Sequence, residues 1–336
     1  MDTGLVLAVL LAIAFATTNG LHDASNAIAT LVATRAAKPS QAIVLAAVFN
    51  LLGPFVIGAA VADTIAGIVT VPPKDATAVI GAGLAAAVGW NLITWYRGLP
   101  SSSGNALVGG LVGAALIEGG TGAVNWGGFD GLRPVGVFGA LVALAISPPL
   151  GALGALIVIR ALRRAARRAT RRLHGPVNGG QWVMSAALAF SHGANDAQKS
   201  IGVIAALLLA AGEIDTLSAP TWVTLACAAA LTMGTSLGGW RIIRTVGRRI
   251  YRIQPVEGLA SQSASAGVIF GASLLGAPTS TTQVVASSLV GIGAGRGRLH
   301  HVHWLLVRRM GFAWLITIPI TALLAMGAYE IWSWVA

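Results

Sequence analysis

The chain has 336 residues, of which 55% are hydrophobic and only 10% are charged, and its mean hydropathy is +0.77. Soluble domains carry about 25% charged residues, and several apolar runs here exceed the roughly 20 residues that cross a bilayer. The composition therefore excludes a soluble protein and predicts an all-α polytopic membrane protein. The net charge of +11 comes largely from arginines beside apolar runs, which indicates cytoplasmic loops and no nucleic-acid partner.

Residues 1–159 are expected to form a first transmembrane repeat. Its first segment is interrupted by polar residues at 17–20, lacks a basic leader, and is expected to stay in the protein as a helix. A polar connection is expected at 63–75, and a glycine-rich loop at 118–133. The apolar segments are expected at residues 4–34, 40–62, 76–96, 106–116 and 134–159.

Residues 160–176 are expected to form a basic cytoplasmic linker that touches anionic lipid headgroups. Residues 177–336 are then expected to form a second transmembrane repeat. Its lone cysteine, Cys227, excludes an internal disulfide. The apolar segments are expected at residues 181–211, 220–240, 256–275 and 310–334, with a short apolar piece of small residues after Gln283.

Two polar motifs interrupt the apolar segments, and each occurs twice. Residues 20–26 read GLHDASN and residues 193–199 read GANDAQK. A Pro-Ser/Thr box occurs at residues 100–103 (PSSS) and 278–282 (PTSTT). The separation is 77 residues from Asp23 to Pro100 and 82 residues from Asp196 to Pro278. Two motifs repeated in the same order at similar spacing indicate an internal duplication.

Charge sets the expected orientation. With about five passes per half and the N-terminus outside, nearly all arginines and lysines fall on the cytoplasmic side, and both termini lie outside. An odd number of passes inverts the second half relative to the first. The sequence thus predicts two inverted-topology repeats, with broken helices or re-entrant hairpins, around a site near the membrane midplane, as in many secondary transporters.

Asp23 and Asp196 are the central candidates in this site. One intramembrane aspartate could cap a helix, but two at equivalent positions favour function. A carboxylate near amide oxygens can coordinate Na⁺ or carry a proton. Lys199 either pairs with Asp196 or balances a substrate anion. Because an ammonium stands where the first motif has Asn26, the sequence favours H⁺ over Na⁺.

The Ser/Thr boxes begin short apolar pieces, where free backbone N–H groups attract anions. They could merely satisfy broken backbone, but a pair favours binding of a tetrahedral oxyanion such as phosphate. His22 and His192 could relay protons or simply pack, and Asn50 is a candidate by its intramembrane position alone. Sulfate symport is the alternative, and a channel or a sensor is less favoured. No ATP-binding loop of the G-x-x-x-x-G-K-[ST] type is found, which disfavours ATP-driven transport. No nucleophile–base pair emerges from the spacing, so no enzyme is expected.

These motifs resemble the duplicated signature of the PiT inorganic phosphate transporters, over nearly the whole chain. The resemblance implies a phosphate symporter, often a homodimer, in the plasma membrane, without a cofactor or resident metal. His22 and the pair Gln198–Lys199 depart from the signature and are similar to the bacterial low-affinity branch, which is proton-coupled and moves neutral metal–phosphate complexes. The implied coupling-ion residues are Asp23, Asn26, Asn195 and Asp196. The implied phosphate ligands are Ser101, Ser102, Ser103, Thr279, Ser280, Thr281 and Thr282, with Gln198 and Lys199 close by.

Overall fold

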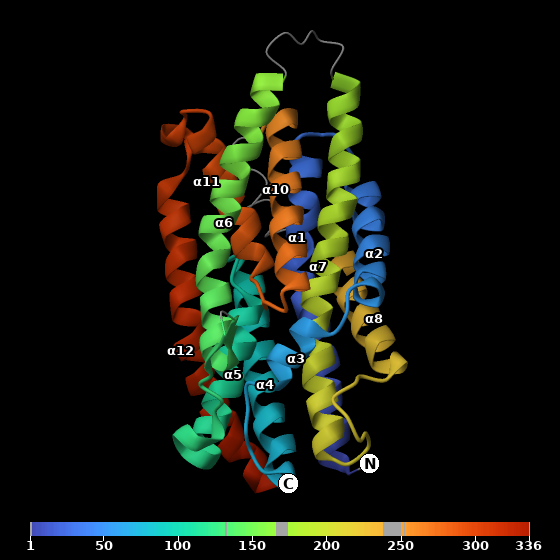
Figure 1. Cartoon of the computed structure of the whole chain (residues 1–336), viewed down its shortest axis with the longest axis vertical. Coiled ribbons are helices and arrows are strands. Elements are labelled where there is room, and N and C mark those ends of the chain that lie inside the picture. The colour runs from blue at the N-terminus through green and yellow to red at the C-terminus, as the bar shows by residue number, and fades with distance from the viewer. Residues whose placement is uncertain (1, 132, 166–173, 238–249, 252, 336) are drawn as a thin grey trace.

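The computed structural model describes residues 2–131, 133–165, 174–237, 250–251 and 253–335. The chain is an elongated bundle of helices, most of them running along its long axis (Figure 1). Six of the described helices are long and apolar enough to cross a membrane. The chain is therefore an all-α polytopic membrane protein, as predicted. The arginines at residues 167–172 and 241–249, and Arg252, were predicted to lie on the cytoplasmic side, and they fall outside the described residues.

The first half is predominantly helical, with one small hairpin. Two short strands, β1 and β2, pair antiparallel with Gly128 opposite Val135, within the predicted glycine-rich loop. The elements in order are α1 (Thr3–Ala33), α2 (Pro39–Val56), α3 (Ala60–Ala66), α4 (Pro73–Arg97), α5 (Ser103–Gly119), a 3₁₀ turn η1 (Gly120–Ala123), β1 (Gly128–Asp130), β2 (Arg133–Val135) and α6 (Gly136–Ala165).

The second half begins at the far side of the basic linker. The start of α1 and the end of α12 lie at one end of the bundle. The end of α6 and the start of α7, which flank the linker, lie at the other end (Figure 1). Its described elements are α7 (His174–Ala210), α8 (Thr221–Leu237), α10 (Pro255–Leu274), α11 (Thr281–Gly295), a 3₁₀ turn η5 (Leu299–His301) and α12 (Trp304–Val335).

Two expectations about local structure were wrong. The predicted interruption at residues 17–20 is absent, because α1 is continuous from Thr3–Ala33. The hydroxyls of Thr17 and Thr18 bond to the carbonyls of Ile13 and Phe15 in the same helix, so their polar groups need no break. The predicted polar connection at 63–75 also contains helix, since α3 occupies Ala60–Ala66.

Each Ser/Thr box joins two helices into a hairpin. Residues 98–102 join α4 to α5, and residues 275–280 join α10 to α11. The α4–α5 hairpin occupies the end of the bundle that holds the termini, whereas α10–α11 occupies the linker end (Figure 1). Approach from opposite ends is what inverted repeats require. The division into repeats at residues 1–159 and 177–336 stays a prediction.

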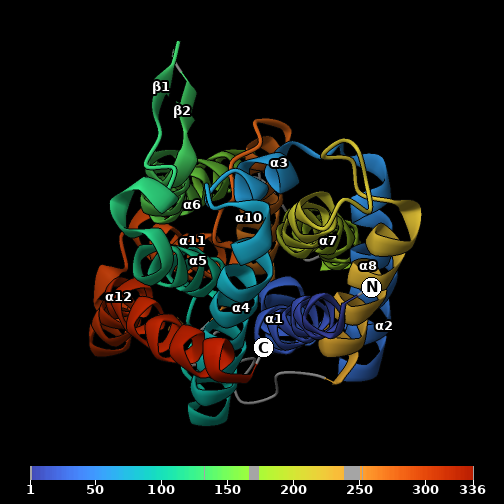
Figure 2. The same ribbon diagram turned by 90° about the horizontal axis from the view of Figure 1, so that it is seen from below.

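The motif glycines lie where helices of the two halves cross. A Cβ on Gly20 of α1 would lie 2.1 Å from the Leu231 carbonyl oxygen of α8, and one on Gly193 of α7 would lie 2.2 Å from the Asn50 carbonyl oxygen of α2. Real side chains do not tolerate such distances, so only glycine permits these backbone contacts. The four helices gather on one side of the bundle in the end-on view (Figure 2).

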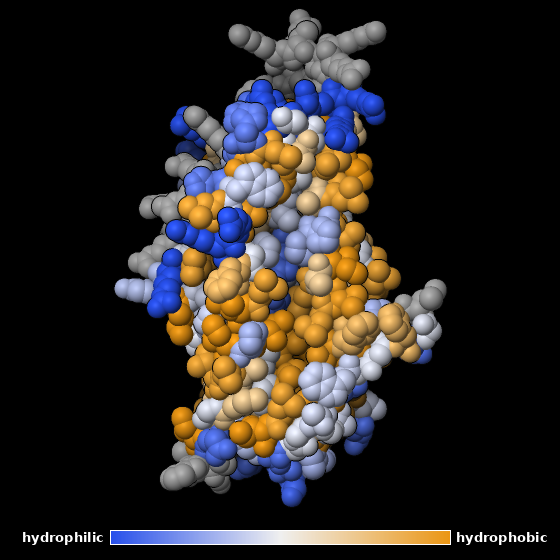
Figure 3. All heavy atoms as spheres, turned by 90° about the vertical axis from the view of Figure 1, so that its left-hand side faces the viewer, coloured by the Kyte–Doolittle hydropathy of each residue, from blue (hydrophilic) through white to orange (hydrophobic). Residues whose placement is uncertain are grey.

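The outer surface suits a bilayer. Hydrophobic side chains cover most of the middle of the face in Figure 3, and hydrophilic ones gather toward its two ends. Leu315 and Leu323 of α12, for example, are 77% and 68% exposed. In contrast, polar side chains of the two motifs such as Asp23, Asn26, Asp196 and Lys199 are buried in the interior. The fold therefore places lipid-facing surface outside and its polar groups around a central site.

Candidate substrate and coupling-ion site

The N-terminus of α11 joins the two aspartates into one network. The Thr281 hydroxyl lies 3.0 Å from Asp196 Oδ2 and 3.3 Å from Asp23 Oδ2. The Thr282 hydroxyl bonds Asp23 Oδ1, and Asn26 Nδ2 lies 3.2 Å from both hydroxyl oxygens. Asp23 and Asp196 are only 4% and 1% exposed. Residues that lie far apart in the sequence thus share one buried polar centre.

Lys199 connects this centre to both boxes. Its ammonium pairs with Asp196, one helical turn back on α7, and donates a 2.9 Å hydrogen bond to the Thr279 carbonyl of the second box. A Cβ on Gly104, just after the first box, would lie 3.4 Å from Lys199 Nζ. A buried ammonium is costly unless it is paired and hydrogen-bonded, and here both conditions are met. The predicted Asp196–Lys199 pair is present.

His192 lies between the two aspartates, and His22 lies beside Asp23, with its Nδ1 3.9 Å from Asp23 Oδ1. His192 Nε2 lies 2.9 Å from Asp196 Oδ2 and 4.0 Å from Asp23 Oδ2, while its Nδ1 lies 3.0 Å from Asn50 Oδ1. His22 Nε2 contacts the Thr94 hydroxyl at 3.1 Å. The ligand atoms of Asp23, His192 and Asp196 lie within 4.8 Å of one another, so these three side chains could hold a cation.

In the second box, one buried hydroxyl has no hydrogen-bond partner among the described residues. The Ser280 hydroxyl accepts a 3.3 Å hydrogen bond from the Gln283 backbone N–H and so caps α11. The Thr279 hydroxyl is buried and has no hydrogen-bond partner within the described residues. Nearby, Asn195 Nδ2 donates to Ser273 Oγ at 3.0 Å, which ties α7 to the end of α10. Among the hydroxyls of the second box, that of Thr279 is thus the one without a hydrogen bond in the described part of the chain.

The first box is more fully occupied. Ser102 caps α5 by accepting from the Asn105 N–H at 3.2 Å. The Ser101 hydroxyl lies 3.0 Å from the Thr317 hydroxyl of α12 and 3.2 Å from Trp90 Nε1. The Ser103 hydroxyl is buried without a partner among the described residues. Ser103 therefore also has an unpartnered hydroxyl, although Ser101 is the residue that aligns with Thr279 when the caps Ser102 and Ser280 are matched.

Two features of the site had no signal in the sequence. Thr317 lies in an apolar run with no motif around it, and its link to Ser101 spans 216 positions of the chain. Gln198 turns to α3, where its Oε1 accepts a 3.0 Å hydrogen bond from the Val61 N–H. Within the described residues, Gln198 forms no hydrogen bond with either box. The sequence could not predict this hydrogen bond to Val61, because α3 was not expected as a helix.

The chain is similar in sequence to known phosphate transporters. The profile of the phosphate transporter family matches residues 19–177 and again residues 166–325. A probable low-affinity inorganic phosphate transporter of Bacillus subtilis is 41% identical over 98% of both chains, and one of Rhizobium meliloti is 37% identical over 97% of this chain and 95% of its own length.

The fold has a solved counterpart. A structure described as the sodium-dependent phosphate transporter superposes with a TM-score of 0.87 over 100% of both chains, at 24% identity. The resemblance stated from the duplicated motifs is confirmed, and the relatives are transporters rather than enzymes. The chain belongs to the phosphate transporter family.

Proposed function

We propose that this phosphate transporter imports inorganic phosphate across the plasma membrane in symport with protons, by alternating access, with both termini outside. The observation that carries the proposal is the buried Lys199 ammonium, which is tied to Asp196 and to the Thr279 carbonyl. A resident cation there supplies the charge that Na⁺ would otherwise bring to Asp196. Asp23, which has no such lysine, is the carboxylate that would take up the coupling proton.

Phosphate would bind between the two boxes. Lys199 lies next to both of them, and the unpartnered hydroxyls of Ser103 and Thr279 face no competing acceptor in the described chain. Ser102 and Ser280 use their hydroxyls as helix caps, so we expect them to contribute backbone N–H groups instead. A helix N-terminus favours an anion through these groups.

Two further proposals concern the cation. A divalent metal carried as cargo with phosphate would meet the ligand atoms of Asp23, His192 and Asp196. Sodium coupling is the second candidate, since the same three side chains could hold Na⁺. The name of the structural counterpart, the sodium-dependent phosphate transporter, agrees with that alternative.

Uptake into proteoliposomes distinguishes the coupling ions. With pH and Na⁺ gradients imposed separately, we expect an inward proton gradient alone to drive accumulation of labelled phosphate above equilibrium. A requirement for Na⁺, with no response to the pH gradient, would overturn proton coupling. Uptake that only equilibrates would indicate a channel, and strong competition by sulfate would contradict phosphate selectivity.

Replacement of the lysine tests its role directly. We expect Lys199→Asn, which restores the residue of the first motif, to reduce proton-driven uptake at least tenfold, because about 1.4 kcal/mol of lost binding already gives a factor of ten. The matched control is Lys74→Gln, since Lys74 is an exposed lysine in the first turn of α4. Proton-driven uptake that survives Lys199→Asn unchanged would remove the basis of the proposal.

A further inference from the structure

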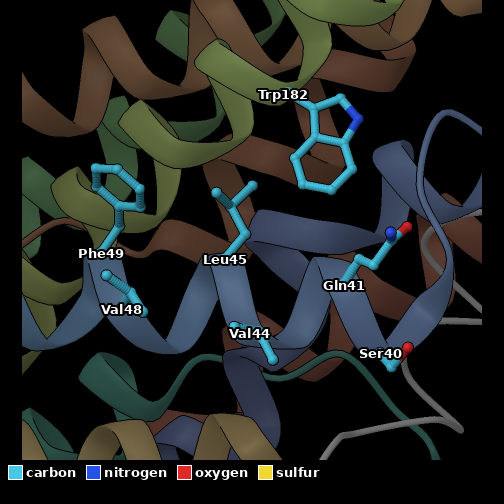
Figure 4. A pocket seen from close by; sticks show the side chains of 7 residues that line it. All are labelled: Ser40, Gln41, Val44, Leu45, Val48, Phe49 and Trp182. Carbon is cyan, nitrogen blue, oxygen red and sulfur yellow. The ribbon is translucent and has the colours of Figure 1, made fainter.

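A groove of about 470 Å³ lies on the outer face of the bundle, where α2 meets α7. Val44, Leu45, Val48 and Phe49 of α2 form its long wall, and Trp182 of α7 forms the opposite wall. Leu45 and Phe49 extend from α2 toward the side on which Trp182 lies (Figure 4). Val44 is 63% exposed and Val48 is 48% exposed. The groove is therefore apolar and open to the hydrocarbon of a bilayer.

The length of the groove matches one leaflet. From Ser40 to Phe49, at 1.5 Å per helical residue, it extends about 14 Å. The hydrocarbon core is about 30 Å thick, so the groove spans about half of it. It starts at the beginning of α2, which points toward the end of the bundle that carries the basic linker (Figure 1). An acyl chain lying in the leaflet at that end fits this depth.

The mouth of the groove is positively charged. Arg35 and Lys38 are exposed in the turn that leads into α2, directly before the lining residue Ser40. Neither forms an ion pair with an acidic side chain in the described part of the chain. Trp182 Nε1 donates a 3.1 Å hydrogen bond to the Ala36 carbonyl of the same turn, which fixes the indole at the mouth. Tryptophan and basic residues gather at headgroup level in membrane proteins.

We propose that this groove binds one anionic phospholipid of the cytoplasmic leaflet, with an acyl chain along α2 and its headgroup phosphate at Arg35 and Lys38. Basic residues near the membrane surface attract anionic lipid by about 1 kcal/mol each. A second copy of this chain fits less well. A two-fold contact places the same patch on both partners and so would bring these positive charges toward each other.

The inner end of the groove adjoins the candidate site. Phe49 precedes Asn50, whose amide contacts His192 and whose backbone packs against Gly193. A lipid chain in the groove thus lies against the crossing of α2 and α7. The binding proposal itself does not depend on which cation drives transport.

Native mass spectrometry of the full-length protein, released from nanodiscs of phosphatidylcholine with a minority of phosphatidylglycerol, tests the site. We expect the wild-type chain to retain one phosphatidylglycerol and to discriminate against phosphatidylcholine. The Arg35→Gln/Lys38→Gln double variant changes only exposed side chains and should reduce retention at least tenfold. Leu45→Trp, which fills the groove, should do the same.

Matched controls locate the effect. Leu52 lies on α2 outside the groove and is 47% exposed, so Leu52→Trp should retain the lipid, as should Lys74→Gln at the opposite end. Wild-type retention by the Arg35→Gln/Lys38→Gln variant, or equal retention of phosphatidylcholine, would overturn the proposal. A change in oligomeric state in Leu45→Trp with an unchanged lipid count would assign the groove to a second copy of the chain instead.

Discussion

Asp196, unlike its counterpart Asp23, pairs with a lysine in the described part of the site. Its carboxylate contacts Lys199, His192 and the Thr281 hydroxyl, which come from α7 and α11. Both charges of the Asp196–Lys199 pair are buried, so neither can lose its partner without leaving an unpaired ion. Asp196 therefore links the Lys199 charge on α7 to the Thr281 hydroxyl of the second box.

We expect Asp196→Asn to abolish coupled phosphate uptake while the protein remains inserted in membranes. An amide cannot neutralise Lys199, and an unpaired buried charge costs about 3–5 kcal/mol. The double variant Asp196→Asn/Lys199→Met removes that penalty and should melt close to the wild type, yet still not transport. The control is Asp130→Asn, because Asp130 is exposed at the end of β1. Normal uptake by Asp196→Asn would refute the site.

At the residue scale, the sequence predicted the duplicated motifs and also Asn50, but it missed Thr317 and the Val61 partner of Gln198. Asp23 and Asp196 were recognisable because each sits in a repeated polar motif within an apolar segment, and they do meet at Thr281. Thr317 and Val61 belong to no motif. Their roles as partners of Ser101 and Gln198 depend on helix packing, which local sequence does not encode.

At the scale of elements, the crossing of α2 and α7 depends on glycine. A Cβ on Gly193 would also lie 2.7 Å from the Asn50 Cα, so Gly193→Ala must push the two backbones apart. We expect this variant to lose uptake and to melt several degrees lower, because overpacking costs about 1–3 kcal/mol. Gly179 lies on the same helix with open space around it. Gly179→Ala should therefore be neutral or stabilising, and equal behaviour of the two variants would contradict the crossing.

The base of the α10–α11 hairpin is closed by an ion pair. Arg296, which follows α11, bonds Glu257 in the first turn of α10, and Glu257 is 1% exposed. Tyr251 packs beside them, and its burial, together with the Glu257 charge, raises the pKa of its phenol. The pair fixes the spacing of the two helices whose tips carry the second box.

Removal of the arginine alone should therefore destabilise the hairpin. We expect Arg296→Met to lower the free energy of unfolding by about 3 kcal/mol, because Glu257 is left buried and unpaired. The Glu257→Gln/Arg296→Met double variant should lose less, and denaturant titration in micelles measures both. The exposed Arg298 supplies the control, Arg298→Met. A double variant as unstable as the sum of its single variants would show that the pair has no coupling energy.

At the scale of the whole molecule, the positions of the termini and the linker define an orientation that labelling can test. Cys227 is fully buried, so it should not react with an impermeant thiol reagent. In intact cells we expect Asp130→Cys to be labelled from outside. Arg164→Cys, at the linker end of α6, should react only after permeabilisation. Labelling in the reverse order would place the termini in the cytoplasm.

The sequence predicted the class of fold and the order of its helices more securely than their junctions. Long apolar runs and flanking arginines are strong signals, and six of the described helices are long and apolar enough to cross a membrane, against ten predicted apolar segments. The continuity of α1 through residues 17–20 was not foreseen, because threonine hydroxyls can bond within their own helix as readily as they break one.

The glycine crossings also bear on how the protein is made. Gly20 packs against Leu231, which the ribosome reaches 211 residues later. At about 5–20 residues per second, α1 waits roughly 10 to 40 seconds for α8. Throughout that interval Asp23 sits in a helix whose partners, Thr281 and Thr282, do not yet exist. Until the second half is made, Asp23 therefore lacks the two hydroxyl partners that it has in the finished fold.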